Sequence, residues 1–144
     1  MSTQSWRTIG DQKIFARSIW EANYGRYLEF LRTHNKIKSW EHEPKTFWFE
    51  GIKRGCVSYK PDFKVTDLSD SVTWYEVKGF YDAKSKTKIK RFEKYYPKEK
   101  LILIDKTWFA KNNIMLRGLI SGWEIGSSRQ FNRNKVKTLY DSKK

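Results

Sequence analysis

The sequence predicts an α/β sandwich built around a small mixed β-sheet, and a few features support this fold class. A helical pattern of apolar residues covers residues 13–33. Two strand-like runs, 56–65 and 72–78, follow the helix. A basic helix over residues 83–96 then leads into the apolar run 101–104, which is typical of a buried strand parallel to the preceding one. The sequence therefore predicts a small mixed sheet flanked by helices.

The first helix is predicted from apolar residues that recur at steps of three and four. Ser18 and Glu21 fit a capping box, with Ser18 as N-cap and Glu21 at position N3. Residues 1–12 are polar and are expected to be loosely held. The apolar stripe consists of Trp20, Tyr24, Tyr27, Leu28 and Leu31.

The two strand-like runs flank a polar segment and predict a β-hairpin with a longer loop. If the hairpin is centred near Ser69, Asp62 lies opposite Glu76, with Cβ atoms about 4.5–5.5 Å apart. Glu76 and Lys78 share one face of their strand, and Val77 points to the other. Because directly opposed like charges are destabilising, this pairing indicates a cation site; scattered charges on a surface hairpin are the alternative.

Two converging carboxylates suit a hard divalent ion such as Mg²⁺, which often takes its remaining ligands from substrate phosphates. Mn²⁺ is expected to substitute for it. Lys78 beside the ion is suited to orient an attacking water and to stabilise negative charge at phosphorus.

The pair Pro61-Asp62 followed by Glu76-Val77-Lys78 resembles the signature of the PD-(D/E)XK nuclease superfamily. The wider context is most similar to the small phage junction-resolving endonucleases, and it is also similar to the end-cleaving nuclease subunit of some transposons. The resemblance covers about residues 20–105. It implies a restriction-endonuclease-like core and a Mg²⁺-dependent phosphodiesterase.

This resemblance also implies roles for individual residues. Asp62 and Glu76 would hold the metal, and Lys78 would assist the nucleophile. Nucleases of this kind carry a further acidic residue on the helix before the core sheet, and residues 17–24 occupy that place. Glu21 is therefore expected to be the third carboxylate, although it also fits a cap. Glu29, two turns further along, is the competing candidate.

The charge of the chain indicates a polyanionic partner. The 144 residues include 30 Lys and Arg against 16 Asp and Glu, a net charge of +14. No basic helix has a wholly apolar face, so nucleic acid is expected rather than a membrane surface. The basic helix is expected to contact DNA phosphates. Its basic residues are Lys84, Lys86, Lys88, Lys90, Arg91 and Lys94.

The length predicts one domain, which the resemblance implies is a nuclease domain over residues 1–126, and the composition predicts a basic and flexible tail over 127–144. Cys56 is the single cysteine, which excludes a disulfide framework and a thiolate zinc site. No apolar run is long enough for a signal peptide or membrane span, so an intracellular location is expected, and the phage resemblance suggests a virus-encoded protein in its host's cytoplasm. His34 and His42 are interpreted as ordinary surface or loop residues.

Further expectations concern packing and partners. The segment after residue 105 is expected to form a short helix that packs on the core through Ile114 and Leu119, among other apolar residues. The chain is expected to form a homodimer that cleaves branched DNA, because junction resolution needs two symmetric cuts. Residues near the N-terminus, such as Ile9 and Ile14, are expected to reach across that interface. The alternatives are a site-specific nuclease of the homing, transposition or mismatch type, and an inactive DNA-binding module.

Overall fold

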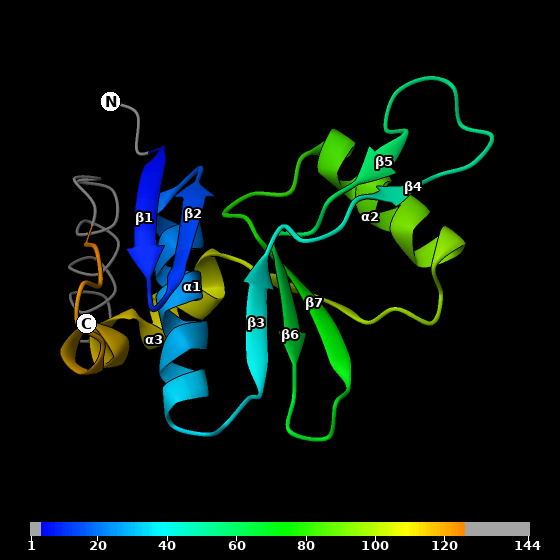
Figure 1. Cartoon of the computed structure of the whole chain (residues 1–144). Helices are drawn as coiled ribbons and strands as arrows, with labels where there is room; N and C mark the ends of the chain where they lie inside the picture. Colours follow the sequence, from blue (N-terminus) through cyan, green and yellow to red (C-terminus); the bar gives the residue numbers. More distant parts are fainter. Residues whose placement is uncertain (1–3, 126–144) are drawn as a thin grey trace.

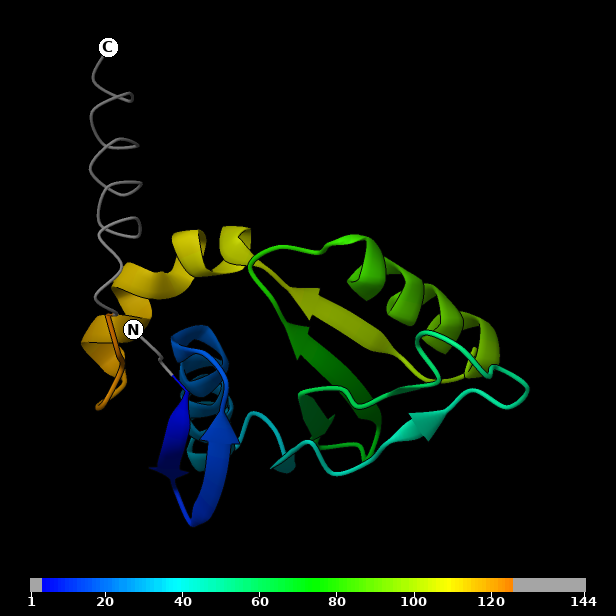
Figure 2. The same ribbon diagram turned by 90° about the horizontal axis from the view of Figure 1, so that it is seen from above.

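A mixed β-sheet with helices on both faces forms the centre of the molecule, in a computed structural model that describes residues 4–125 (Figures 1 and 2). Its strand order is β3 (Ser39–His42), β6 (Phe63–Thr66), β7 (Val72–Val77) and β8 (Leu101–Ile104). The pairs β3–β6 and β6–β7 are antiparallel, and β7–β8 is parallel. The predicted α/β class with a small mixed sheet is confirmed. The predicted tail lies outside the described residues.

Two separate apolar cores lie on the two faces of this sheet, and the other elements pack on the sheet to form them. On β7, Tyr75 and Val77 join the core formed with α1 and α3, whereas Trp74 joins the core formed with α2. This alternation is the period of two expected for a strand buried on both faces. These elements are β1 (Ser5–Ile9), β2 (Gln12–Ala16), α1 (Ile19–Thr33), β4 (Phe47–Trp48), β5 (Ser58–Tyr59), α2 (Ala83–Tyr95) and α3 (Lys106–Leu119).

The β6–β7 hairpin has the predicted register. Phe63 pairs with Tyr75, so the hairpin is centred on position 69, and continuing this register by one residue places Asp62 opposite Glu76. The predicted first strand is nevertheless interrupted. Its early part, β5, pairs with β4, and Pro61 lies in the break before β6. Proline cannot donate to a strand ladder, which explains why the strand stops there.

The N-terminal residues form a β-hairpin that was not predicted from the sequence. Strands β1 and β2 pair from Ser5–Ala16 to Ile9–Gln12, and Gly10 in the turn has a φ of 61°, which glycine adopts without strain. The prediction that residues 1–12 are loosely held is therefore wrong for the described part. The predicted helix start at residue 13 is also wrong, because α1 begins at Ile19. The predicted cap is confirmed: the Ser18 hydroxyl accepts the Glu21 N–H at 3.0 Å.

The predicted basic helix and following strand are confirmed as α2 and β8, with β8 parallel to β7. The prediction that this strand is buried is wrong for Leu103, which is 42% exposed because β8 lies at the edge of the sheet. Helix α3 packs on the core through Phe109 and Leu116. The expectation that Ile114 and Leu119 also pack inward is wrong. Each is 58% exposed, because the helical period turns them away from the buried stripe.

Candidate functional site

The predicted site residues meet at one end of the central sheet. Because β3 and β7 both run antiparallel to β6, the last residues of β3 and β7 lie beside the first residue of β6 (Figure 1). Asp62 directly precedes β6, and Glu76 and Lys78 lie at the end of β7. Glu21, in the first turn of α1, reaches the same place through a bond to His42 at the end of β3.

Asp62 and Glu76 form a carboxyl pair at this end of the sheet, in which Asp62 is buried and Glu76 is half-buried. The Asp62 Oδ2 atom accepts the Val77 N–H at 2.8 Å, and the Glu76 carboxyl lies within hydrogen-bonding range of the Asp62 carboxyl. Burial, together with the negative charges of Glu76 and Glu21, raises the pKa of Asp62 well above its usual value. The structure thus brings together the two carboxylates that the hairpin register predicted.

Glu76 is held by tyrosine hydroxyls. Tyr59 donates to its Oε2 atom at 2.9 Å, and Tyr81 donates to its backbone oxygen at 3.2 Å. Burial raises the pKa of Tyr59, which keeps its hydroxyl neutral and able to donate. Burial also raises the pKa of the Glu76 carboxyl, against the opposing positive charges of Lys88 and Lys78. The Glu76 side chain therefore has a fixed position and cationic neighbours.

Lys78 connects the end of β7 to the start of α2. Its Nζ atom donates to the Ser85 Oγ atom at 2.5 Å, and its backbone N–H donates to Ile104 O at 2.9 Å. Ser85 is itself buried, and its N–H donates to Asp82, the N-cap of α2. The ammonium group is thus fixed close to Glu76 and directed toward the first turn of α2.

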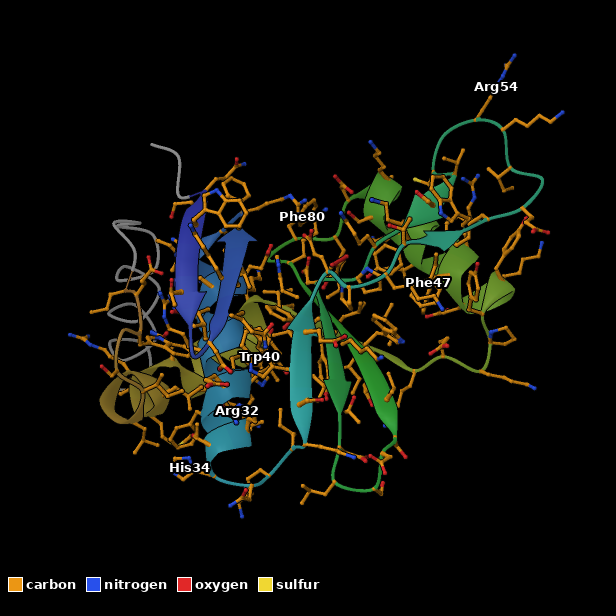
Figure 3. The ribbon with its side chains drawn as sticks, in the orientation of Figure 1. Arg32, His34, Trp40, Phe47, Arg54 and Phe80 are labelled. Atoms are coloured by element: carbon orange, nitrogen blue, oxygen red, sulfur yellow. The ribbon has the colours of Figure 1, made fainter. Side chains whose placement is uncertain are left out.

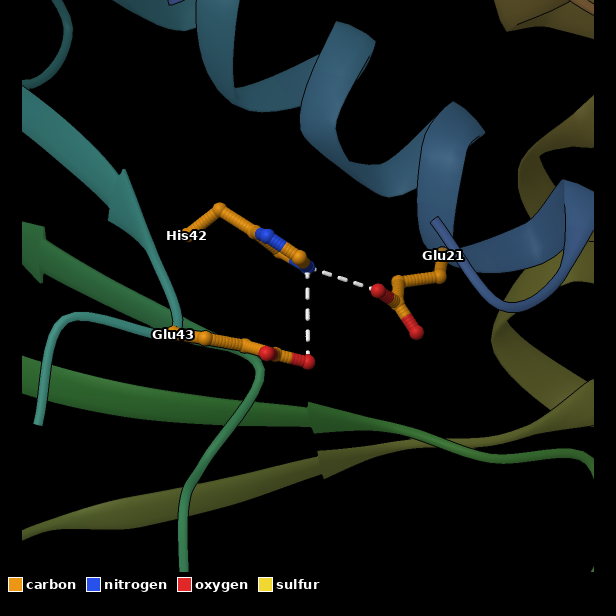
Figure 4. Close-up of side chains that lie close together, drawn as sticks. All are labelled: Glu21, His42 and Glu43. Carbon is orange, nitrogen blue, oxygen red and sulfur yellow. Dashed lines mark hydrogen bonds and ion pairs between the residues drawn. The ribbon is translucent and has the colours of Figure 1, made fainter. Parts of the chain in front are cut away.

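Glu21, and not Glu29, lies beside the carboxyl pair. The buried Glu21 carboxylate accepts from His42 Nε2 at 2.6 Å, and its charge raises the pKa of Asp62 (Figure 4). Glu29 is engaged elsewhere: Arg32 donates to both of its oxygens at 2.7 and 2.8 Å, and Trp40 Nε1 donates at 3.0 Å. Of the two candidates for the third carboxylate, Glu21 is therefore the one that lies near Asp62.

His42 is the site residue that the sequence reading missed. The interpretation of both histidines as surface residues holds for His34, which is exposed, and is wrong for His42, whose side chain is only 8% exposed. The ring lies 5.2 Å from that of Phe63, between centroids. One signal was available: Trp40 and His42 are two residues apart in a strand and so share a face, which a core tryptophan would turn inward.

Glu43 is close to this histidine but has other partners. Ligand atoms of Glu21, His42 and Glu43 lie within 4.8 Å of one another, and the closest approach of His42 to Glu43 is 3.8 Å (Figure 4). Glu43 also forms a salt bridge with Arg17 and lies 3.5 Å from Lys60 Nζ. Glu43 thus already has cationic partners, whereas the Glu21 carboxylate is bonded to His42.

Three carboxylates lie near this end of the sheet, and carboxylate oxygens are the ligands that hard divalent cations prefer. Asp62, Glu76 and Glu21 supply these carboxylates from different segments of the chain, and burial, followed by the negative charges of Glu76 and Glu21, raises the pKa of Asp62. Among the described residues, the group whose ligand atoms all lie within 4.8 Å of one another is Glu21, His42 and Glu43. Mg²⁺ and Mn²⁺ both prefer carboxylate ligands. His42 bonds one oxygen of Glu21, an arrangement in which a neighbouring group orients a ligating carboxylate.

The basic residues of α2 divide into two groups. Lys88 lies with its Nζ 6.0 Å from the centre of the Tyr59 ring, and its charge opposes the rise that burial causes in the pKa of Glu76, so it lies on the carboxylate side. Arg91 donates to Cys56 O at 2.7 Å and fastens α2 to the segment before β5. The exposed group, available to an external polyanion, consists of Lys84, Lys86, Lys90 and Lys94.

Comparison with known proteins places this chain in a family. Residues 7–112 match the family described as Protein of unknown function (DUF1064), and because the match covers more than half of the sequence, the chain belongs to this family. No curated protein and no solved structure matches the chain. The matched span includes all of the candidate site residues. Within the described residues, no helix is both long and apolar enough to cross a membrane.

Proposed function

We propose that this protein is a divalent-metal-dependent DNA endonuclease of the PD-(D/E)XK type, which hydrolyses phosphodiester bonds. The observation that carries this proposal is the pair of Asp62, which is buried, and Glu76, which is half-buried; the hairpin register sets them opposite each other, and Lys78 lies two residues beyond Glu76. A purely structural role gives little reason to place two carboxyl groups opposite each other, because opposed like charges destabilise a sheet. A bound cation would remove that cost.

Each residue of the site has a task in this reaction. Asp62, Glu76 and Glu21 would hold Mg²⁺, which when bound supplies an activated water at neutral pH and neutralises charge on the scissile phosphate. Lys78, fixed by its bond to Ser85, would orient the nucleophile and stabilise charge that develops at phosphorus. Bonds from Tyr59 and from the Val77 N–H would keep the carboxylates in place, and His42 would do the same for Glu21.

DNA is the substrate that the charges favour. The chain carries a net charge of +14, and α2 follows β7 after a short loop, so its exposed lysines lie next in sequence to the carboxylates. A polyanionic backbone that contacts these lysines would pass close to the site. An inactive DNA-binding module would share this surface, but it would have no need for the complete set of carboxylates and lysine.

Branched DNA and a homodimer are the finer parts of this proposal. Both rest on the similarity of residues 59–63 and 75–79 to junction-resolving endonucleases. Two nicks at a junction need two sites, and a two-fold dimer presents the same site twice. The alternative is a site-specific nuclease of the homing, transposition or mismatch type, which would prefer one sequence over a branch.

A cleavage assay tests the proposal directly. The purified full-length protein is incubated with a four-way junction, a mismatched duplex, single strands and a plain duplex, each with Mg²⁺, Mn²⁺ or excess chelator. We expect metal-dependent cleavage that is strongest on the junction. Asp62→Asn and Glu76→Gln should each reduce the rate roughly 100-fold or more while DNA binding survives. Glu41→Gln, an exposed carboxylate on β3, serves as the matched control and should have little effect.

The outcomes separate the parts of the proposal. Undiminished cleavage in excess chelator would contradict the metal assignment. Binding of every DNA without cleavage of any would favour the inactive binding module. Equal cleavage of junction and duplex, with a preference for one sequence, would favour the site-specific nuclease.

A further inference from the structure

Phe80 is an exposed aromatic residue immediately beside the candidate site. At 77% exposure it is the most exposed of the large hydrophobic side chains in the described part of the chain. It lies on the loop between β7 and α2, two residues after Lys78 (Figure 3). Single exposed apolar residues are common and need no explanation by themselves. Phe80 differs from such residues because it lies beside the candidate site and because the loop that carries it is anchored on both sides.

The backbone on both sides of Phe80 is anchored. A Cβ atom at Gly79 would come within 2.7 Å of the Trp20 ring, so the backbone there packs directly on that ring, which stacks on Phe109 at 4.8 Å between centroids. On the other side, Tyr81 donates to Glu76 O at 3.2 Å. Asp82 follows as the N-cap of α2. The Phe80 ring is therefore exposed to solvent on a segment whose backbone is anchored on both sides.

Lysines outnumber acidic residues in the sequence around Phe80, where Asp82 is the acidic neighbour. Lys78 precedes it, and Lys84 and Lys86 follow in the first turn of α2, where both are exposed. Proteins that bind single-stranded nucleic acid combine these two features, a positively charged path for the backbone and aromatic rings on which bases stack. Cationic residues beside an exposed ring thus favour a nucleic-acid strand over an apolar partner.

The distances also suit a nucleobase. Two residues of extended chain span at most about 7 Å. Successive bases along one strand are about 3.4 Å apart when stacked. A ring two residues from Lys78 can therefore reach a base within about two nucleotides of a phosphate held at that lysine.

We propose that Phe80 stacks on an unpaired nucleobase adjacent to the scissile phosphate. This inference rests on the proposed nuclease function and names its substrate class: DNA in which bases near the cut are unpaired, as at a branch point or in a single strand. In an intact duplex each base already stacks on its neighbours and presents no free face. Since every base has a π-face, the selection is for structure and not for sequence.

Binding measurements in excess chelator test this inference without requiring cleavage. The ligands are labelled oligonucleotides of one sequence, presented as a single strand, as a duplex with a bulge, and as a continuous duplex. Phe80→Ala should weaken binding to the first two about 5- to 150-fold, and to the continuous duplex less than about 2-fold. Phe80→Trp should retain the preference. The matched control is Leu68→Ala, which removes a side chain of 65% exposure from the loop at the other end of the β6–β7 hairpin and should change nothing.

A base analogue gives an independent readout. 2-Aminopurine placed at the bulge should be quenched by the wild-type protein and by Phe80→Trp, but not by Phe80→Ala. Equal loss of affinity on all three DNAs, or no loss on any, would overturn the inference. Cleavage by the wild-type protein with an unaffected Phe80→Ala variant would overturn it and leave the nuclease proposal intact. A Phe80-dependent preference without cleavage in Mg²⁺ would support the stacking site and overturn the nuclease.

Discussion

At the scale of single residues, the site consists of carboxylates held where they repel each other. Asp62 is buried, and the negative charges of Glu76 and Glu21 help to raise its pKa. Hydrogen bonds from Val77 and Tyr59 keep the pair in place despite this repulsion. Buried charges without compensation are costly, so the metal-free protein is expected to be less stable than its core alone would allow. Removing one of these charges should therefore increase folding stability and decrease cleavage activity.

Asp62→Asn should stabilise the metal-free protein at neutral pH while abolishing cleavage. The amide keeps an oxygen that accepts the Val77 N–H and removes the repelling charge. Because the pKa of Asp62 is raised in the folded state, the variant is expected to have the higher Tm at neutral pH. For a chain of this length, each kcal/mol gained in the free energy of unfolding raises the Tm by roughly 2–4 °C. Thermal unfolding in excess chelator measures it.

The raised pKa of Asp62 determines the direction in which folding stability changes with pH. Because the pKa of Asp62 is raised in the folded state, the folded protein binds more protons than the unfolded chain above the ordinary aspartate pKa. The stability of the wild-type protein should therefore fall as pH rises from that ordinary value through the raised one, and Asp62→Asn should lack this fall. Mg²⁺ should raise the Tm of the wild type but not of the variant. A lower Tm for the variant at neutral pH would show that the carboxylate is stabilising.

His42 should matter for metal affinity more than for folding. Its Nε2 donates to Glu21, and a neighbour that orients a metal ligand typically contributes 10- to 100-fold to affinity. His42→Leu should therefore need about 10-fold or more Mg²⁺ for half-maximal activity, and His42→Gln, which can still donate, should need less. His34→Gln is the matched control on an exposed histidine. An unchanged Mg²⁺ requirement in His42→Leu would show that His42 contributes to packing and not to metal affinity.

At the scale of elements, the β6–β7 hairpin could be predicted and the contacts around it could not. The polar segment between two β-rich runs gives the hairpin centre, and strand pairing then places Asp62 opposite Glu76. His42 meets Glu21 only because β3 packs beside α1, a long-range contact that no local pattern specifies. The β1–β2 hairpin was misread because its five-residue strands are too short to separate a period of two from a helical one.

Helix α2 should contribute electrostatic affinity without sequence preference. Lys86 and Lys90 are exposed on it and are expected to contact phosphates, which carry no sequence information. The double variant Lys86→Gln, Lys90→Gln should weaken binding to all duplex sequences alike and reduce the log–log salt slope by about 0.9 for each lost contact. Fluorescence anisotropy at several salt concentrations measures this, with Lys36→Gln, in the turn after α1, as the control. A changed sequence preference at an unchanged slope would contradict a phosphate role.

At the scale of the whole molecule, net charge and exposed apolar surface act in opposite directions on self-association. The chain carries a charge of +14, which opposes the approach of a second copy. The expected N-terminal contribution to a dimer needs correction, because Ile9 and Ile14 are buried in the core of their own chain. Trp6 and Phe15 remain exposed on that hairpin, and Ile114, Met115 and Leu119 are exposed on α3. These exposed apolar side chains are candidates for a dimer interface.

The proposed homodimer should therefore strengthen as salt rises, opposite to DNA binding. Screening at higher ionic strength weakens the repulsion between the charged copies, whereas burial of apolar surface is little affected by it. Sedimentation or light scattering should give about twice the mass of the chain at high salt and a larger monomer fraction at low salt. Leu119→Lys should shift the equilibrium toward monomer, and Leu68→Lys, an equally exposed leucine at the tip of the β6–β7 loop, should not. If the chain remains a monomer at every salt concentration and cuts junction and duplex equally, the homodimer and the branched substrate are both wrong, and the nuclease proposal then rests on the site alone.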